Sequence, residues 1–425
     1  ITREGDRIVG RSAADAFIER NVDREVVLKQ VDLGIDIEGY VASEPDKSEA
    51  YRPGSEQQNL REAVRAQATV EVNSPGRLFQ SLKSSLRFDS FRSTEVFGEH
   101  FQIEELTAMI LEPMKAAADR AAGRSIERAV FGRPVRFSQM PAQDHLAEER
   151  LRRAALLAGF KDVVFFFEPV AACVEYAVAT DRKQRLMVVD IGGGTCDVCI
   201  MEFGGTGNEA QRLSDSRILS VAGVPTAGDA VDRDVIRAKL YPCFGSRARY
   251  GPSQLPMPQY LFKGIAEWQN LYKLNTEEII NWLIAAENSS DQPKALRALR
   301  YLIQHNYGYP VRRIVEAAKK RLSFEEEGAI DIRHGAIDIV EQISRDEFNA
   351  IIEDTLAEMM GSVEEAEHAA QLRPDQVDLV LTTGGTSLIP AVRTMLEERY
   401  GKERIRQRDT FSSVAMGLAI VARYT

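Results

Sequence analysis

The stretch RLMVVDIGGGTCDVCIMEF, residues 185–203, decides the fold. Apolar residues on both sides of three glycines predict two β-strands joined by a tight turn. The glycines at 192–194 let the backbone bring its N–H groups onto an anion. Asp190 and Asp197 flank them, and a carboxylate there could hold hydrated Mg²⁺ or orient an attacking water. The alternative is a plain glycine hairpin with a surface aspartate, which the entropy cost of three adjacent glycines disfavours.

A second glycine pair closes another apolar strand. In LTTGGTSLIPAV, residues 381–392, Gly384 and Gly385 lie where the strand turns into a helix. Ligands in open α/β sheets bind at the carboxyl ends of strands, and bare glycines there admit a flat base or a phosphate. Taken alone, the pair is also typical of an ordinary strand-to-helix turn.

The rest of the chain alternates strands with helices, which predicts an α/β fold. The polar stretch at 37–58 is predicted to be a loop or insertion, and 240–310 a mostly polar region with helical segments. Buried strands are predicted at 128–135, 163–167 and 377–385, and a strand hairpin at 328–343. Helices are predicted at 103–120, 147–160, 168–179, 311–323, 387–401 and 412–424. A further, long helix is predicted to begin after Ser344, with a Ser344–Glu347 capping box.

A polar stripe follows one face of the helix predicted for VEAAKKRLS, residues 315–323. Its members are Glu316, Lys319, Lys320 and Ser323. Such a stripe could bond a ribose and an adenine edge. A solvated helix with a Glu–Lys pair explains the same pattern equally well.

Two further charged residues are candidates because of their surroundings. Lys83 lies in RLFQSLKSSL, residues 77–86, beside an apolar stripe of Phe79, Leu82 and Leu86. A lysine near a phosphate can stabilise transferring charge, although an isolated helix lysine is usually only solvated. Glu168 follows the strand at 163–167, where a carboxylate could reach the water shell of a metal or cap a helix.

Composition restricts the classes of partner. The 425 residues carry a net charge of −10 with a pI of about 5.3, so repulsion from phosphate backbones argues against nucleic acid. No apolar stretch is long enough to span a bilayer, so no membrane partner is expected. The four cysteines favour a reducing cytoplasm. Cys196 and Cys199, three apart on a predicted strand, should point to opposite faces as core fillers rather than form a redox or metal pair. The five histidines make no metal-binding spacing.

These segments, in this order, resemble the ATPase domain of the heat shock protein 70 (DnaK-type) chaperones of the actin-like ATPase superfamily. DIGGGTCDV is similar to the second phosphate motif, FEPVAA (167–172) to the first interlobe connection, and AGDAVD (227–232) to the loop touching the outer phosphates. VEAAKKRLS is similar to the adenosine-contacting helix, LTTGGTSLIPAV to the adenosine motif, and SSVAMGLAI (412–420) to the second interlobe connection. LFQSLKSSL, GRPVRF, AGDAVD and the tryptophan-containing insert after Tyr241 resemble the YegD-like branch most closely.

The resemblance implies two lobes of ribonuclease-H-like fold around a cleft for ATP or ADP with Mg²⁺. Lobe I would be residues 1–183 with 411–425, and lobe II residues 184–410 with a helical insert at about 233–345. Asp190 would hold the metal through water, Lys83 would be the catalytic lysine and Glu168 a metal-shell carboxylate. The residues implied to hold nucleotide are Gly192, Gly193, Gly194, Thr195, Gly228, Glu316, Lys319, Lys320, Ser323, Gly384, Gly385 and Thr386.

The sequence departs from the family pattern at three places. The family's first phosphate hairpin should precede Ile1. Whether a segment, including a targeting sequence, precedes Ile1 is therefore left open. Ala227 replaces the first glycine of the Gly-Gly loop, and Leu388 stands where an arginine is expected to stack on adenine, which implies weaker base binding. The chain stops at Thr425 without the family's peptide-binding domain, so direct client binding of the usual kind is not expected.

The expected function is that of an ATP-binding, ATP-hydrolysing chaperone-like protein, with hydrolysis conditional on the first phosphate hairpin. A protein client or co-chaperone is the expected partner besides nucleotide. A non-catalytic nucleotide-sensing scaffold and an actin-like filament protein are the alternatives. A sugar kinase of the same superfamily is disfavoured, since no sugar-binding segment is visible.

Overall fold

The computed structural model of the chain describes residues 1–41, 60–204, 207–408 and 412–424, and side chains except those of 30–70. The loop or insertion predicted at 37–58 lies outside the described residues from residue 42 onward. Residues 37–41 belong to strand β1 (Leu28–Val41).

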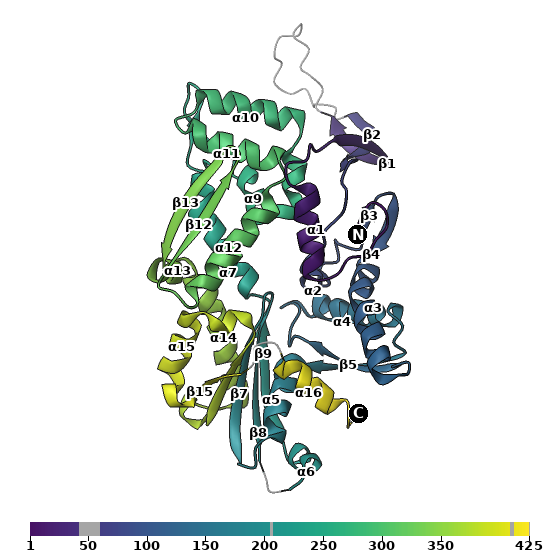
Figure 1. Cartoon of the computed structure of the whole chain (residues 1–425), viewed down its shortest axis with the longest axis vertical. Helices are drawn as coiled ribbons and strands as arrows, with labels where there is room; N and C mark the ends of the chain where they lie inside the picture. Colours follow the sequence, from purple (N-terminus) through teal and green to yellow (C-terminus); the bar gives the residue numbers. More distant parts are fainter. Residues whose placement is uncertain (42–59, 205–206, 409–411, 425) are drawn as a thin grey trace, which may run out of the picture.

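The predicted glycine hairpin lies at the centre of a five-stranded mixed sheet with the order β15-β14-β7-β8-β9 (Figure 1). β8 is antiparallel to β7 and β9, whereas β14 is parallel to β7 and β15. The strands are β7 (Gln184–Ile191), β8 (Cys196–Phe203), β9 (Arg217–Val224), β14 (Leu379–Thr383) and β15 (Ile405–Gln407). The predicted hairpin at 185–203 and the predicted strand at 377–385 are therefore confirmed.

Both faces of this sheet are buried, which explains why β7 and β8 are mainly apolar. α14 (Glu353–Ala370) covers one face and α5 (Glu168–Val178) the other. Alternate strand residues point to opposite faces. Cys196 therefore packs in the core beneath α14 and Cys199 in the core beneath α5, and each is 0% exposed. The prediction that this pair fills the core is confirmed.

A second, two-stranded parallel sheet packs against α5 from the N-terminal half of the chain. Its strands are β5 (Arg128–Arg133) and β6 (Asp162–Phe167). The elements near it are α3 (Ile103–Ala122), α4 (Pro141–Leu157), β3 (Ser93–Val96) and β4 (Glu99–Gln102). The strands predicted to be buried at 128–135 and 163–167 are mostly half-exposed, because in the described chain each pairs only with the other. α4 begins at Pro141 rather than 147, since proline suits the first helical turn.

The last helix, α16 (Ser413–Val421), packs closely against α5. A Cβ atom on Gly417 would lie 1.8 Å from the carbonyl oxygen of Ala171. The small residues that characterise this C-terminal segment therefore allow the two helix backbones to approach each other.

Between β9 and β14 the chain forms a large, mainly helical insert. Its elements are α7 (Gly228–Val235), η1 (Ile236–Leu240), α8 (Tyr241–Cys243), β10 (Arg249–Tyr250), β11 (Leu255–Pro256), α9 (Tyr260–Ala266), η2 (Trp268–Leu274), α10 (Glu277–Ser289), α11 (Pro293–Gln304), α12 (Gly308–Leu322), β12 (Glu327–His334) and β13 (Ile337–Ser344). The region 240–310, predicted as mostly polar, contributes fully buried residues such as Phe244 and Phe262 to the largest core. That core continues without a break into the five-stranded sheet.

The long helix predicted behind Ser344 is interrupted. α13 (Arg345–Ile351) is followed by Ile352, whose φ and ψ are −98° and 8°, and α14 begins at the next residue. The Ser344 hydroxyl accepts the Glu347 N–H at 3.1 Å, as predicted. The reciprocal bond, from the Ser344 N–H to the Glu347 side chain, was predicted wrongly, because the Glu347 carboxylate instead accepts a hydrogen bond from Lys239 at 2.8 Å.

Helix α1 (Arg11–Asn21) packs against the helical insert (Figure 1). The ring centroid of Phe17 lies 5.7 Å from that of Trp268 and 5.8 Å from that of Tyr309. Asp15 and Arg313 form an ion pair at 2.7 Å. Residues far apart in sequence thus join the N-terminal part of the chain to the insert.

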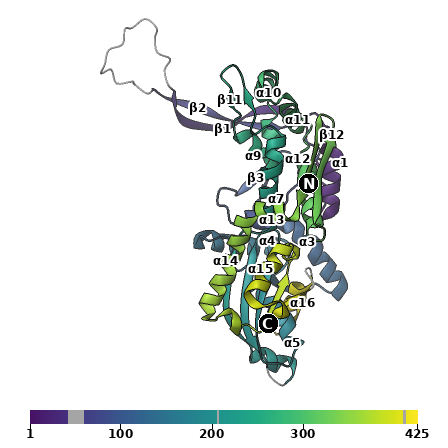
Figure 2. The ribbon, with the colours of Figure 1, turned by 90° about the vertical axis from the view of Figure 1, so that its left-hand side faces the viewer.

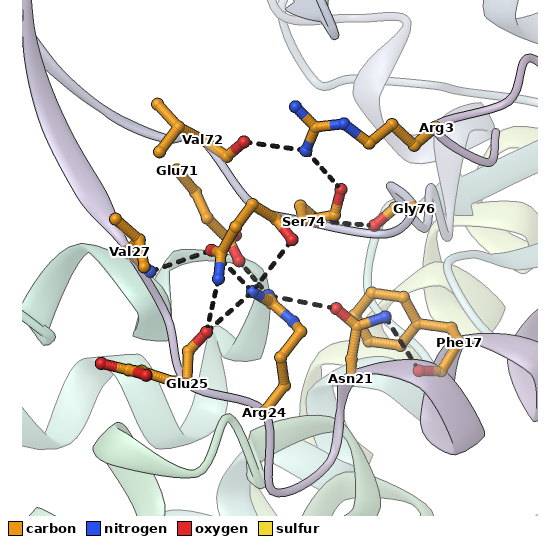
Figure 3. A network of polar contacts seen from close by, with 11 residues as sticks. Arg3, Phe17, Asn21, Arg24, Glu25, Val27, Glu71, Val72, Ser74 and Gly76 are labelled. Carbon is orange, nitrogen blue, oxygen red and sulfur yellow. Dashed lines mark hydrogen bonds and ion pairs between the residues drawn. The ribbon is translucent and has the colours of Figure 1, made fainter.

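The segment after α1 is held to the end of β2 (Leu60–Glu71) and the segment after it by hydrogen bonds and an ion pair of Arg24 (Figure 3). Its guanidinium pairs with Glu71 and donates to the Asn73 side-chain oxygen at 2.8 Å. Asn73 in turn donates to the Glu25 carbonyl at 2.7 Å. These bonds fix the base of the hairpin formed by β1 and β2, which projects from the molecule in Figure 2. In the described part of the chain, no helix combines the length and apolar character needed to cross a bilayer.

Candidate functional site

The two glycine clusters lie side by side, because the strands that precede them are neighbours. β7 and β14 run parallel with Asp190 opposite Thr383, so both strands end at the same edge of the sheet. Gly384 has a φ of +81°, and a Cβ atom there would lie 2.3 Å from the Ile191 carbonyl oxygen and 2.8 Å from Asp190 Oδ1. Only glycine fits this contact.

The glycine turn at 192–194 is held by its carbonyl groups. The Gly192 carbonyl accepts from the Thr386 hydroxyl at 2.7 Å and from the Gly228 N–H at 3.2 Å. The Gly193 carbonyl accepts from the Asp229 N–H at 2.7 Å. The N–H groups of Gly193 and Gly194 have no hydrogen-bond partner among the described residues. Two unpaired N–H groups in a fixed turn suit an anion.

A cavity of about 240 Å³ lies in front of this turn. It is lined by Ser81, Lys83, Ser84, Arg87, Phe137, Glu168, Asp190, Gly192, Gly193, Gly194, Thr195 and Asp229. The structure therefore brings Lys83, Glu168 and Asp190 together with the glycine turn. Sequence reasoning missed Arg87, which lies four residues after Lys83, and Asp229, which lies within the quoted AGDAVD segment.

Lys83 and Glu168 face each other across the cavity wall. Lys83 lies in α2 (Leu82–Ser85), a single helical turn shorter than the predicted stripe, and Glu168 is the first residue of α5. Lys83 Nζ lies 2.6 Å from Glu168 Oε1 and 2.9 Å from Oε2. The α2 turn also presses on the glycine turn, since a Cβ atom on Gly194 would lie 2.7 Å from Ser84 Oγ.

Asp190 is the most perturbed acid in the cavity. Burial and, to a smaller extent, the negative charge of Glu168 raise its pKa to about 7, against the opposing effect of Lys83. Asp190 is therefore partly protonated at neutral pH, and a nearby cation would favour its charged form. Mg²⁺ prefers oxygen ligands and keeps most of its waters, so Asp190 and Glu168 suit a water-mediated site. Among the described residues, no group of three acidic, histidine or cysteine side chains could hold an ion directly.

Asp197, the other acid of the hairpin, lies behind the cavity rather than in it. It is 1% exposed and accepts the Val135 N–H at 2.6 Å. Burial raises its pKa to about 7 against the opposing bond from Thr195. The suggestion that Asp197 could act like Asp190 is therefore corrected, since it joins β8 to the segment after β5.

The polar stripe of α12 does not act as one set. Lys319 turns inward, to an ion pair with Asp232 at 2.6 Å and a hydrogen bond to the Gly228 carbonyl at 3.1 Å. Lys320 turns outward and pairs with Glu316 at 2.7 Å. Ser323 bonds the Lys319 carbonyl at 3.4 Å. None of the four lines the cavity, so the structure brings only Lys319 near the glycine turn, through Gly228.

At the other glycine pair, Gly385 is exposed while Thr386 is 6% exposed. Leu388 is half-buried in the short helix η4 (Gly385–Leu388), before α15 (Pro390–Tyr400). These residues adjoin the glycine turn without lining the cavity. Gly384 nevertheless lies next to the cavity, since a Cβ atom on it would be 2.8 Å from Asp190 Oδ1, a lining residue.

Comparison with known proteins fits this geometry. The model of the family described as Hsp70 protein matches residues 80–211 and 304–424, more than half of the chain. The chaperone protein DnaK of Thermus thermophilus is 28% identical over 339 residues, covering 77% of this chain and 44% of that protein. The DnaK of Thermosipho melanesiensis is 24% identical over 355 residues, covering 81% and 48%. The chain thus spans less than half the length of these relatives.

Helices on both faces of a mixed sheet agree with the expected actin-like, two-lobed ATPase fold. The cavity residues at 81–87 and 190–195 fall inside the matched residues, whereas Asp229, α1 and most of the helical insert fall outside them. The chain belongs to the Hsp70 family.

Proposed function

We propose that this chain binds ATP or ADP with Mg²⁺ in the cavity at the glycine turn and hydrolyses ATP slowly. The observation that carries the proposal is the convergence of unpaired N–H groups, a lysine and two carboxylates on one cavity. The N–H groups of Gly193 and Gly194 would receive phosphate oxygens. Thr195 would support the same phosphates from the end of the turn.

Each charged residue has a proposed role. Lys83 would stabilise charge on the transferring phosphoryl group, while Glu168 holds the ammonium group in place at 2.6 Å. Asp190 would bind a water of the metal shell and orient the attacking water. Bound Mg²⁺ would supply neutralisation of charge on the phosphates.

The nucleoside would lie beyond the turn, towards Gly384, Gly385 and Thr386. Exposed Gly385 leaves its backbone open to a base. The α12 residues Glu316, Lys319, Lys320 and Ser323 would border the ribose and adenine. Lys319 would act through Gly228, whose carbonyl it holds at 3.1 Å.

The proposal extends to a chaperone-like role with a protein client or co-chaperone, supported by the relatives named chaperone protein DnaK. Assignment to the YegD-like branch and a cytoplasmic location stay predictions, the latter supported by four free cysteines. The proposed lobes are residues 1–183 with 411–425 and residues 184–410.

Calorimetric titration of the full-length protein with MgATP and MgADP tests the proposal. We expect saturable binding that weakens when Mg²⁺ is removed by a chelator. If neither nucleotide binds, the nucleotide assignment is wrong. Adenosine serves as the control ligand, because it reaches only the nucleoside end.

A non-catalytic nucleotide sensor is the second candidate. The bidentate Lys83–Glu168 pair favours it, because the ammonium group is already neutralised. Phosphate release under single-turnover conditions distinguishes the two. Nucleotide binding without release would favour the sensor.

A further inference from the structure

Arg87 shares the cavity with Lys83 but has a different set of contacts. The α2 turn is anchored by Leu82 and Leu86, which are 7% and 0% exposed. Lys83 and Arg87 are four residues apart and both line the cavity. The short turn therefore directs two cations to one side.

The Arg87 guanidinium is incompletely paired. Nη1 donates to the Phe137 carbonyl at 2.9 Å, whereas Nε is buried without a partner and no hydrogen bond from Nη2 is found among the described residues. No acid of the described chain forms an ion pair with Arg87. Lys83, by contrast, forms an ion pair with Glu168.

Other buried arginines differ from Arg87 in their partners or their place. The Nε atoms of Arg24, Arg212 and Arg312 are also buried without a partner, but none of these arginines lines the cavity. Arg133 is paired with Asp144 and Glu148. Arg150 donates to the carbonyl groups of Leu86 and Phe88, each at 2.9 Å. Arg87 differs because burial lowers its pKa without a compensating negative charge. A buried donor without an acceptor destabilises a folded protein unless a ligand provides the acceptor.

The acids that share the cavity are already engaged. Glu168 is held by Lys83, and Asp229 is held by Arg312 at 2.7 Å. Burial keeps Asp190 partly protonated, with a pKa of about 7. The missing negative charge must therefore come from a ligand. A guanidinium group that lines the cavity without a carboxylate partner suits the oxygens of a phosphate.

We propose that Arg87 binds the terminal phosphate of the nucleotide through its guanidinium group, as a second cation beside Lys83. The proposal rests on the proposed function, because it assumes that a polyphosphate enters this cavity. In this arrangement Arg87 distinguishes ligands by the number of their phosphates.

The test compares Arg87→Met with Arg92→Met in the full-length protein. Arg92 is a matched control, because its side chain is 75% exposed and pairs with Asp89 outside the cavity. Calorimetry would measure dissociation constants for MgATP, MgADP, adenosine and inorganic tripolyphosphate. Loss of a charge-assisted bond should weaken MgATP and tripolyphosphate by about tenfold to a hundredfold in R87M, with less change for MgADP. Adenosine binding, and every affinity of R92M, should stay unchanged.

Arg87→Lys keeps the charge but loses the fork, so it should recover part of the affinity. Thermal unfolding serves as the structural readout. Met removes the unpaired buried donor but also the hydrogen bond to the Phe137 carbonyl, so ligand-free R87M should unfold close to the unaltered protein. R87K carries the test if R87M is unstable. If R87M loses affinity equally for adenosine and MgATP, Arg87 only positions Phe137 and does not bind phosphate. If no affinity changes, Arg87 has no part in binding.

The controls separate this proposal from the function on which it rests. If the unaltered protein binds tripolyphosphate in an Arg87-dependent way but not MgATP, the nucleotide assignment fails and the phosphate role of Arg87 survives. If it binds neither, both are wrong.

Discussion

The phosphate end and the nucleoside end of the proposed site are built differently. At the phosphate end, side chains from α2, β7, α5 and α7 converge, and several groups lack partners or have shifted pKa values. At the nucleoside end, the polar stripe of α12 is satisfied by its own neighbours. Lys319 has Asp232, Lys320 has Glu316, and Ser323 has a backbone carbonyl.

The difference shows which end of the site can be recognised in the ligand-free protein. Unmatched charges are costly to fold, so their presence at one place indicates that a ligand completes them. Satisfied charges give no such signal. Perturbing the phosphate end should therefore change chemistry, and perturbing the nucleoside end should mostly change stability.

The largest effect is expected from Asp190→Asn. The variant keeps the shape of the side chain but removes the charge that orients water, so the hydrolysis rate should fall roughly a hundredfold or more. Nucleotide should remain bound, as measured by calorimetry beside a phosphate-release assay. Unchanged turnover would contradict the chemical role of the phosphate end.

Gly384→Ala should strongly destabilise the fold where the two ends meet. The new Cβ atom would lie 2.3 Å from the Ile191 carbonyl oxygen at a φ of +81°. Denaturant unfolding should report a loss of about 2–4 kcal/mol. Gly385→Ala is the control, since a Cβ there meets nothing within 4 Å, and should change stability by less than about 0.5 kcal/mol. Similar losses in both variants would show that crowding at Gly384 is unimportant.

Stability should fall as pH rises from 5 to 7. Burial raises the pKa of Asp190 and of Asp197 from 3.8 to about 7. Between these values the folded state binds more protons than the unfolded state, so the free energy of unfolding decreases with pH, by roughly 1–3 kcal/mol. Urea titrations across this range measure it. Asp197→Asn should flatten the slope, and an increase in stability with pH would refute the cause.

The smallest effects are expected at the nucleoside end, where two adjacent lysines form a matched pair. Lys319→Met leaves Asp232, 2% exposed, without its closest cation and should cost about 1–3 kcal/mol. Lys320→Met breaks an exposed pair and should cost less than about 0.5 kcal/mol. Equal losses in chemical denaturation would indicate that the two lysines share one environment, as the sequence pattern suggested.

The sequence predicted β7, β8 and β14 and the glycine turns that follow β7 and β14, because local signals are strong there. Three glycines between apolar strands and Gly384 at a strand end leave few alternatives. Arg87 and Asp229 were missed because their importance depends on segments about 140 residues apart meeting in one cavity. The different directions of Lys319 and Lys320 depend on Asp232 from another helix, which helical periodicity does not contain.

Tertiary packing also decided the errors in the secondary structure. The break at Ile352, which is 0% exposed, lets α13 and α14 pack separately, against a continuous helical pattern. β5 and β6 are apolar enough to predict burial, yet their two-stranded sheet leaves them half-exposed. Sequence periodicity indicates which faces are apolar, but not how much covers them.

The placement of Cys196 and Cys199 on opposite faces of β8 provides two internal reporters. A thiol-alkylating reagent reacts only with a sulfur that has become accessible, so each alkylation rate measures the opening of one layer. Peptide mass spectrometry of partly alkylated protein would show whether both layers open in one step. The order in which the two thiols are modified thus reports how cooperatively the two layers unfold.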